Sequence, residues 1–167
     1  IVYREKNNIT KDIANGTAVN IVTMVFGNMG DDSGTGVVFT RNGHNGKKEI
    51  EGEYLINAQG EDVVAGVRTG KDISKLKIEM PKSYRELSNA CSKLEKHFRE
   101  PQDIEFTIEK GKFYLLQTRT AKMSAGALVK TSVDMVREKL IDKNRALTRI
   151  PAQQLEALLH KTIDQNK

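Results

Sequence analysis

Residues 102–119 alternate apolar and polar side chains around a short turn, and this pattern leaves few folds open to the chain. The first run is Asp-Ile-Glu-Phe-Thr-Ile-Glu and the second is Phe-Tyr-Leu-Leu-Gln-Thr-Arg, with Lys110-Gly111 between them. Successive side chains of a strand point to opposite faces, and a short glycine-containing loop joins antiparallel strands. The sequence therefore predicts a β-hairpin over Asp103–Arg119.

One face of the predicted hairpin is polar. The alternation separates Asp103, Glu105 and Thr107 from Ile104, Phe106 and Ile108. A three-residue turn over 109–111, with Gly111 left-handed, is expected to put Asp103 opposite Gln117. Glu105 and Arg119 are then diagonal neighbours of that pair.

Two carboxylates, an amide and a guanidinium converge in this arrangement. Carboxylate and amide oxygens suit Mg²⁺, and a guanidinium suits phosphate oxygens. An exposed polar strand with an ordinary Asp–Arg ion pair accounts for the same residues. Spacing alone favours this second interpretation, because such surface pairs are common.

Further strands are expected before the hairpin, and helices around and after it. The expected strands are Thr17–Phe26, Val37–Thr40 and Lys48–Ile56, with a turn at Asn42–Lys47. The expected helices are the end of one at Ile1–Asn8, then Ser83–Phe98, Ser124–Leu140, Asp142–Arg149 and Gln153–His160. Residues 59–69 form a loop with room for one helical turn. The fold class is therefore α+β: an antiparallel sheet with packed helices over residues 1–120, followed by a helical segment over residues 121–167.

Two local patterns narrow the interpretation. The loop Gly27–Gly36 contains four glycines, but it matches neither the Walker pattern nor GxGxxG before a helix, because a strand follows it. In the helix Ser83–Phe98, the spacing of Leu87, Leu94 and Phe98 places all three toward the sheet.

Composition argues against several classes of protein. The 27 basic residues are scattered among 22 acidic ones, whereas nucleic-acid binding requires a clustered basic face with stacking aromatics. The net charge of +5 suits a polyanionic ligand such as ATP at least as well. No apolar run approaches the roughly 18 residues of a membrane span. The single Cys91 indicates a reducing compartment, for which we expect the cytoplasm, with an organelle as the alternative.

The remaining candidate groups are weak. His44, His97 and His160 lack the spacing of metal ligands. The acidic pair at Glu61 is either solvated, a cap of the following turn, or close to a nucleotide. Because the chain opens at Ile1 without Met and closes on polar residues, we expect it to be a piece of a longer polypeptide.

Long segments of the sequence resemble the pyruvate, phosphate dikinase family. The likeness is carried by GTAVNIVTMVFGNMGDDSGTGVVFTRN (Gly16–Asn42), GEYLINAQGEDVVAGVRT (Gly52–Thr69) and QDIEFTIEKGKFYLLQTR (Gln102–Arg119). It continues through KTSVDMV (Lys130–Val136) and QLEALLH (Gln154–His160), so it spans nearly the whole chain. The GEYLINAQGEDVVAG run separates this family from the related phosphoenolpyruvate synthases.

The resemblance implies the second half of an ATP-grasp nucleotide-binding domain. The enzyme interconverts ATP, phosphate and pyruvate with AMP, pyrophosphate and phosphoenolpyruvate. In the family's hairpin, Glu105 and Gln117 are the expected Mg²⁺ ligands. Arg119 is expected to hold phosphate charge, and Asp103 to position Arg119 or a water. Glu61 is a further candidate near the nucleotide.

The same resemblance implies partners. These are ATP, the first half of the grasp, and a swivelling domain with a phosphorylated His that lies outside this chain. The full-length enzyme is expected to be a homo-oligomer that binds neither nucleic acid nor membrane, and this chain alone is expected to be inactive. The sequence departs from the family at Val22, usually Gln beside the adenine, at Gly43, usually Pro, and at Thr120–Met123, usually a basic run.

Other functions fit part of the pattern. A phosphoenolpyruvate synthase or a glucan dikinase shares the grasp and the phosphohistidine. A catalytically silent interaction or regulatory module built on half a grasp is the alternative from a different class. The intact set of Asp103, Glu105, Gln117 and Arg119 argues against a silent module.

Overall fold

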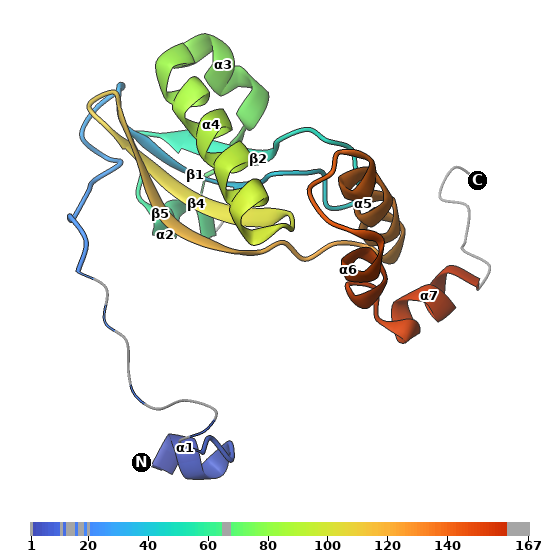
Figure 1. Cartoon of the computed structure of the whole chain (residues 1–167). Helices are drawn as coiled ribbons and strands as arrows, with labels where there is room; N and C mark the ends of the chain where they lie inside the picture. Colours follow the sequence, from blue (N-terminus) through green and yellow to red (C-terminus); the bar gives the residue numbers. More distant parts are fainter. Residues whose placement is uncertain are drawn as a thin grey trace.

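A five-stranded antiparallel sheet lies at the centre of the fold, with helices packed against it (Figure 1). The computed structural model describes residues 2–10, 12, 16, 19, 21–64 and 68–159. The strands are β1 (Gly34–Phe39), β2 (Glu51–Ile56), β3 (Lys71–Asp72), β4 (Gln102–Glu109) and β5 (Lys112–Thr120). Their order is β3-β2-β1-β4-β5, so β5 is an edge strand of the described sheet. The predicted α+β class is confirmed.

The described residues form seven α-helices. They are α1 (Val2–Lys6), α2 (Gly60–Val64), α3 (Leu76–Glu79), α4 (Pro81–Phe98), α5 (Ala125–Arg137), α6 (Lys143–Thr148) and α7 (Ala152–Leu159). Figure 1 shows α3 and α4 over one face of the sheet, α2 on the side away from α3, and α5 to α7 grouped beside one end. None of the helices in the described ranges is long and apolar enough to cross a membrane.

The expected strand at Thr17–Phe26 is wrong where the structure describes it. Val19 and residues 21–26 have no strand structure, and the other three residues of the range lie outside the described part. The side chains of Ile21 and Val22 are 96% and 78% exposed. β-branched residues favour strands because they pack on a half-buried pleated surface. This segment has no such surface beneath it in the described structure, so its propensity alone forms no strand.

Helix α4 buries one line of side chains against the sheet. The line consists of Ser83, Leu87, Cys91 and Glu95, each four residues after the last. Leu87 is fully buried and Leu94 packs at the margin of the core, as expected. Phe98 is 39% exposed, so the expectation that it faces the sheet is wrong. The buried line instead ends on the carboxylate of Glu95.

A buried ion cluster explains why a charged residue ends this line. Arg41 follows β1 and has a completely buried side chain. Its Nε and Nη2 donate to Glu95 Oε1 and Oε2 at 2.7 and 2.9 Å. Its Nη1 and Nη2 also donate to the two carboxylate oxygens of Glu138 at 3.1 and 2.8 Å. The cluster therefore joins the end of β1 to α4 and to the residue that follows α5.

Arg41 stays protonated in this cluster. Burial alone would lower the pKa of its guanidinium, but the hydrogen bonds and charges of Glu95 and Glu138 outweigh burial and raise the pKa above its ordinary value. Lys48 Nζ reaches the same Glu138 carboxylate at 2.8 Å. A buried cation with this many charge-assisted partners holds its neighbours in one arrangement.

Candidate functional site

The β4–β5 hairpin turns on two residues, not on the three expected. Both Lys110 and Gly111 have positive φ, 49° and 72°, which is the requirement of a type I′ turn. The glycine-rich loop holds this conformation, because Lys110 N donates to Ser33 Oγ at 2.9 Å and Gly111 N donates to Asp32 O at 2.8 Å. The expected pairing across the hairpin is therefore wrong, because the expected turn is one residue too long.

A β-bulge then sets the faces of β5. The register shifts just after Glu105, and Leu116 has no partner on β4. An extra residue moves every later side chain of a strand to the other face. Asp103 lies opposite Arg119, and Glu105 lies opposite Gln117. The four side chains thus form two adjacent cross-strand pairs on one face, as the sequence predicts, but with different partners.

Ion pairs orient Arg119 across the two strands. Its Nε donates to Asp103 Oδ2 at 2.7 Å, and its Nη2 lies 3.7 Å from Glu105 Oε1. The hydrogen bond from Arg119 to Asp103 and the charge of that carboxylate raise the pKa of Arg119. The Arg119 side chain is 58% exposed, so the pair adds little stability. The main effect of the pair is to orient the Arg119 guanidinium through Nε. The terminal guanidinium nitrogens make no hydrogen bond in the described part of the chain.

Glu105 and Gln117 have oxygens that suit a hard cation. Glu105 has only the longer contact with Arg119, and the Gln117 amide makes no hydrogen bond within the described residues. No group of three or more His, Cys, Asp or Glu side chains that could share a metal occurs there. Mg²⁺ usually takes one or two protein ligands and completes its shell with water and phosphate oxygens. The pair therefore fits Mg²⁺ carried in with a polyphosphate.

Comparison with known proteins identifies the family. The family model described as "Pyruvate phosphate dikinase, AMP/ATP-binding domain" matches residues 1–81 and 74–140. The chain belongs to this family.

Curated dikinases are similar to the chain along almost all of it. It is 56% identical over 164 residues to the pyruvate, phosphate dikinase of Clostridium symbiosum, and 53% identical over 166 residues to that of Entamoeba histolytica. It is 51% identical over 158 residues to the chloroplastic pyruvate, phosphate dikinase of Flaveria pringlei. These matches cover 98%, 98% and 95% of this chain, but only 18%, 19% and 16% of the relatives. The chain therefore spans less than a fifth of the length of these three relatives.

Glu61, the fifth site residue expected in this dikinase-family chain, lies apart in sequence. It is exposed in the first turn of α2. Within the described part, no hydrogen bond or ion pair joins it to the four hairpin side chains. Its neighbour Asp62 accepts from Gln59 N at 2.8 Å and caps the turn. A role for Glu61 near the nucleotide stays a prediction.

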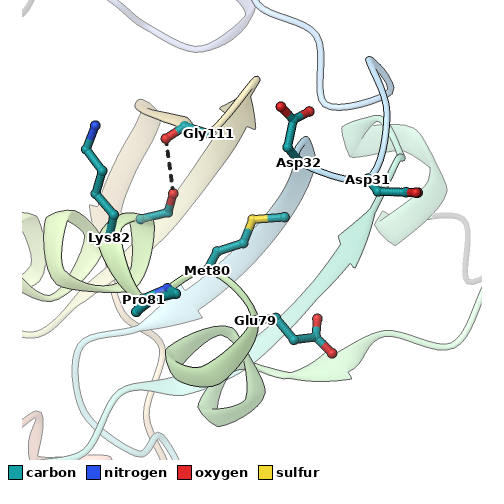
Figure 2. Close-up of a pocket in the computed structure, with 8 residues that line it drawn as sticks. Asp31, Asp32, Glu79, Met80, Pro81, Lys82 and Gly111 are labelled. Atoms are coloured by element: carbon teal, nitrogen blue, oxygen red, sulfur yellow. Dashed lines mark hydrogen bonds between the residues drawn. The ribbon is translucent and has the colours of Figure 1, made fainter.

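A hollow of about 460 Å³ lies elsewhere, between the glycine-rich loop, the hairpin turn and the start of α4. Figure 2 shows Asp31, Asp32 and Glu79 around it, with the two aspartates above Met80 and Glu79 below it. Lys82 is the one cation among its lining residues. Glu79 is paired with Lys71 at 2.8 Å, so Asp31, Asp32 and Lys82 are the other charged lining residues. This lining has no excess positive charge that would attract phosphate oxygens.

Two residues behind the hairpin site were not singled out by the sequence. Gln102 is 1% exposed, and its Oε1 accepts from Thr118 Oγ1 at 2.9 Å. Alternation places Gln102 on the same face as Ile104 and Phe106, which is the buried face. A buried polar side chain in an apolar series requires a hydrogen-bond partner. The position of Gln102 in this series is therefore the sequence pattern that could have indicated both residues.

Proposed function

We propose that this chain is the part of a pyruvate, phosphate dikinase that holds Mg²⁺ and the phosphates of ATP. The observation that carries the proposal is the pairing of Asp103 with Arg119 beside Glu105 with Gln117, on the face of the sheet opposite the core. This arrangement places an oriented cation next to a carboxylate and an amide that make no hydrogen bond within the described residues. Such a set matches the charge and geometry of a metal-bound polyphosphate.

The side chains have separate roles in this proposal. Glu105 and Gln117 would hold Mg²⁺, which when bound neutralises charge on the phosphate oxygens. Arg119 donates to phosphate oxygens from its terminal nitrogens, which make no hydrogen bond within the described residues, while Asp103 fixes the guanidinium through Nε. Phosphoryl transfer requires mainly positioning and charge stabilisation from a protein. These four residues provide both.

The complete reaction requires more than this chain. The dikinase name of the relatives and the AMP/ATP-binding description of the family support transfer from ATP to phosphate and pyruvate, giving AMP, pyrophosphate and phosphoenolpyruvate. We infer that other parts of a longer polypeptide supply the first half of the grasp and the phosphohistidine that carries the group. The described residues contribute the metal-facing and phosphate-facing hairpin.

The test uses the full-length polypeptide that carries this sequence. With ATP, phosphate and pyruvate it should form AMP and phosphoenolpyruvate, and labelled phosphate should appear in pyrophosphate. Chelation of divalent metal should abolish AMP formation, and added Mg²⁺ should restore it. Formation of AMP without label in pyrophosphate would show that water replaces phosphate as the acceptor, as in a synthase. That result would overturn the dikinase proposal.

A further inference from the structure

A chain of hydrogen bonds runs through the sheet directly behind the candidate site. It starts at Thr118, which lies between Gln117 and Arg119 on β5 and faces the opposite side of the sheet. Thr118 Oγ1 donates to Gln102 Oε1 at 2.9 Å. Gln102 is almost fully buried, so without this donor its amide oxygen would lose a partner that water cannot replace.

The direction of this hydrogen bond is fixed by its surroundings. Gln102 Nε2 donates to the backbone oxygens of Glu100 and Pro101, both at 3.2 Å. A carbonyl oxygen only accepts, so the amide nitrogen must face these two groups and Oε1 must face Thr118. The Thr118 hydroxyl is therefore the donor, and only a residue with a donor at this position can replace it.

The backbone of Gln102 continues the chain into the core. Its N donates to Thr40 Oγ1 at 3.0 Å, and Thr40 N donates back to Gln102 O at 2.9 Å. Thr40 Oγ1 donates in turn to Glu95 Oε1 at 3.2 Å. The same carboxylate oxygen accepts from the fully buried Arg41. The chain of hydrogen bonds thus ends on the buried, charge-assisted pair of Arg41 and Glu95.

We propose that Thr118 is a positioning residue that holds Gln117 and Arg119 in place from the back of the sheet. The proposal rests on the function proposed above for these two residues. Within the described sheet, β5 has β4 as its single neighbour. The bulge at Leu116 interrupts the pairing of these strands immediately before Gln117. The hydrogen bond from the Thr118 side chain to Gln102 compensates for the strand pairing that is missing just before Gln117.

The expected consequence is a loss of rate without an equal loss of binding. Gln117 and Arg119 face the phosphates, where charge develops during transfer, so their displacement raises the barrier more than it weakens recognition of ATP. A misplacement on the order of 1 Å can lower a rate by about 10²-fold. The Thr118 hydrogen bond is one of several restraints on β5, so its removal should displace the strand by less than about 1 Å.

The experiment compares Thr118→Val, which removes the hydroxyl, with Thr118→Ser, which keeps it. The full-length polypeptide is assayed for AMP formation in the ATP half-reaction. Thr118→Val should lower kcat about ten-fold and change the KM for ATP less than about two-fold. It should also raise the Mg²⁺ concentration for half-maximal rate. Thr118→Ser should retain kcat within about two-fold, because the donor is preserved.

Thr120→Val is the matched control. Thr120 lies on the same strand and the same face, but it is exposed, and its Oγ1 donates to the half-buried Glu100 side chain at 2.7 Å, outside the buried chain of hydrogen bonds. Its kcat should stay near wild type. If Thr118→Val does not fold, Thr118→Ala removes the same hydroxyl without a new methyl group and carries the same expectation.

The outcomes separate the two proposals. Equal rates for Thr118→Val and wild type would overturn the positioning role, provided that Gln117→Leu is damaged in the same assay. A loss in Thr118→Ser as large as in Thr118→Val would also overturn it, since the hydroxyl would not be the cause. An undamaged Gln117→Leu would overturn the proposed function of the hairpin, and the positioning role with it.

Discussion

Arg119 carries an oriented set of donors, and this distinguishes it from a lysine with the same charge. Nε is bound to Asp103 at 2.7 Å, and the two terminal nitrogens make no hydrogen bond in the described part of the chain. A planar guanidinium can span two phosphate oxygens in this pose, whereas an ammonium is a point charge on a flexible stem. The pair with Asp103 therefore matters for direction more than for stability.

At this scale we predict that Arg119→Lys, Glu105→Gln and Gln117→Leu each lower the ATP half-reaction by about 10²-fold or more. The reason is that all three side chains act on the metal or the phosphates. Recognition of adenine should be largely intact. The measurement is single-turnover formation of AMP and phosphorylated enzyme by the full-length polypeptide.

The control is the second half-reaction, between phosphorylated enzyme and pyruvate. It should survive the three substitutions, because we place it in another part of the polypeptide. A parallel loss in both half-reactions would show that these residues support the fold, and the site assignment would be wrong.

The face of the site could be predicted from the sequence, but its pairing could not. Alternation along β4 correctly grouped Asp103 with Glu105. The register depended on positive φ at Lys110 and on the bulge at Leu116. Neither follows from side-chain pattern, because a non-glycine residue rarely adopts positive φ and the glycine-rich loop stabilises it here. The shorter turn and the bulge each shift the register by one residue in the same direction. A total shift of two residues restores the face, so the four side chains still meet.

Helix α4 shows how a charged residue alters the interpretation of an apolar pattern. Its buried line ends on Glu95, which is bound to Arg41, and Phe98 is left at the surface. The sequence predicted the helix itself to within two residues, because its spacing and flanking prolines are strong signals. It could not predict the end of the buried line, since the partner Arg41 lies 54 positions away.

The revised helix face leads to a prediction on stability. Leu87→Ala should lower the free energy of unfolding of this chain by about 2–5 kcal/mol, because Leu87 is fully buried. Phe98→Ala should cost about 1 kcal/mol, because much of the ring already contacts water. Urea unfolding of both variants tests this. An equal or greater loss for Phe98→Ala would mean that the helix is rotated from the orientation described.

Glu138 links α5 to the buried cluster and makes part of the stability depend on pH. Burial alone would raise its pKa, but hydrogen bonds from Arg41 and Lys48 outweigh burial and lower the pKa below its ordinary value. A carboxylate with a lowered pKa in the folded state stabilises the fold at pH values above its unfolded pKa. That stabilisation is lost as the pH falls through the folded pKa.

We therefore predict that Glu138→Gln lowers the free energy of unfolding at neutral pH, and that the gap to wild type narrows as the pH falls below the ordinary pKa of a glutamate and through the lowered pKa of Glu138. Urea unfolding of this chain across the range from neutral to acidic pH measures the gap. The exposed Glu156→Gln is the control and should behave like wild type throughout. A gap that stays constant or widens on acidification would contradict the proposed ion pair.

At the scale of the whole molecule, the two faces of the sheet are covered to different extents. Helices α3 and α4 cover the core face of the sheet, and α2 lies on the other side (Figure 1). The four hairpin residues lie on the face opposite the core, where the Arg119 side chain is 58% exposed. The apolar residues Ile21, Val22 and Met24 are also exposed. The β-propensity of Thr17–Phe26 predicted a strand in this segment. This propensity reflects how well side chains pack on a neighbouring pleated surface. The prediction failed because no such neighbour lies in the described structure.

An open site has a consequence for the chain taken alone. Electrostatic stabilisation of phosphoryl transfer is strong only where water is excluded and the charges are preorganised. On the exposed hairpin face, Mg²⁺ and phosphate groups keep most of their hydration. We therefore predict that the isolated 167-residue chain forms no AMP from ATP in the presence of Mg²⁺, phosphate and pyruvate. The measurement is AMP release against a protein-free control, with the full-length polypeptide as the positive control. Release of AMP that depends on both pyruvate and phosphate would show that the described residues hold a complete catalytic site, and would contradict the division of labour proposed here.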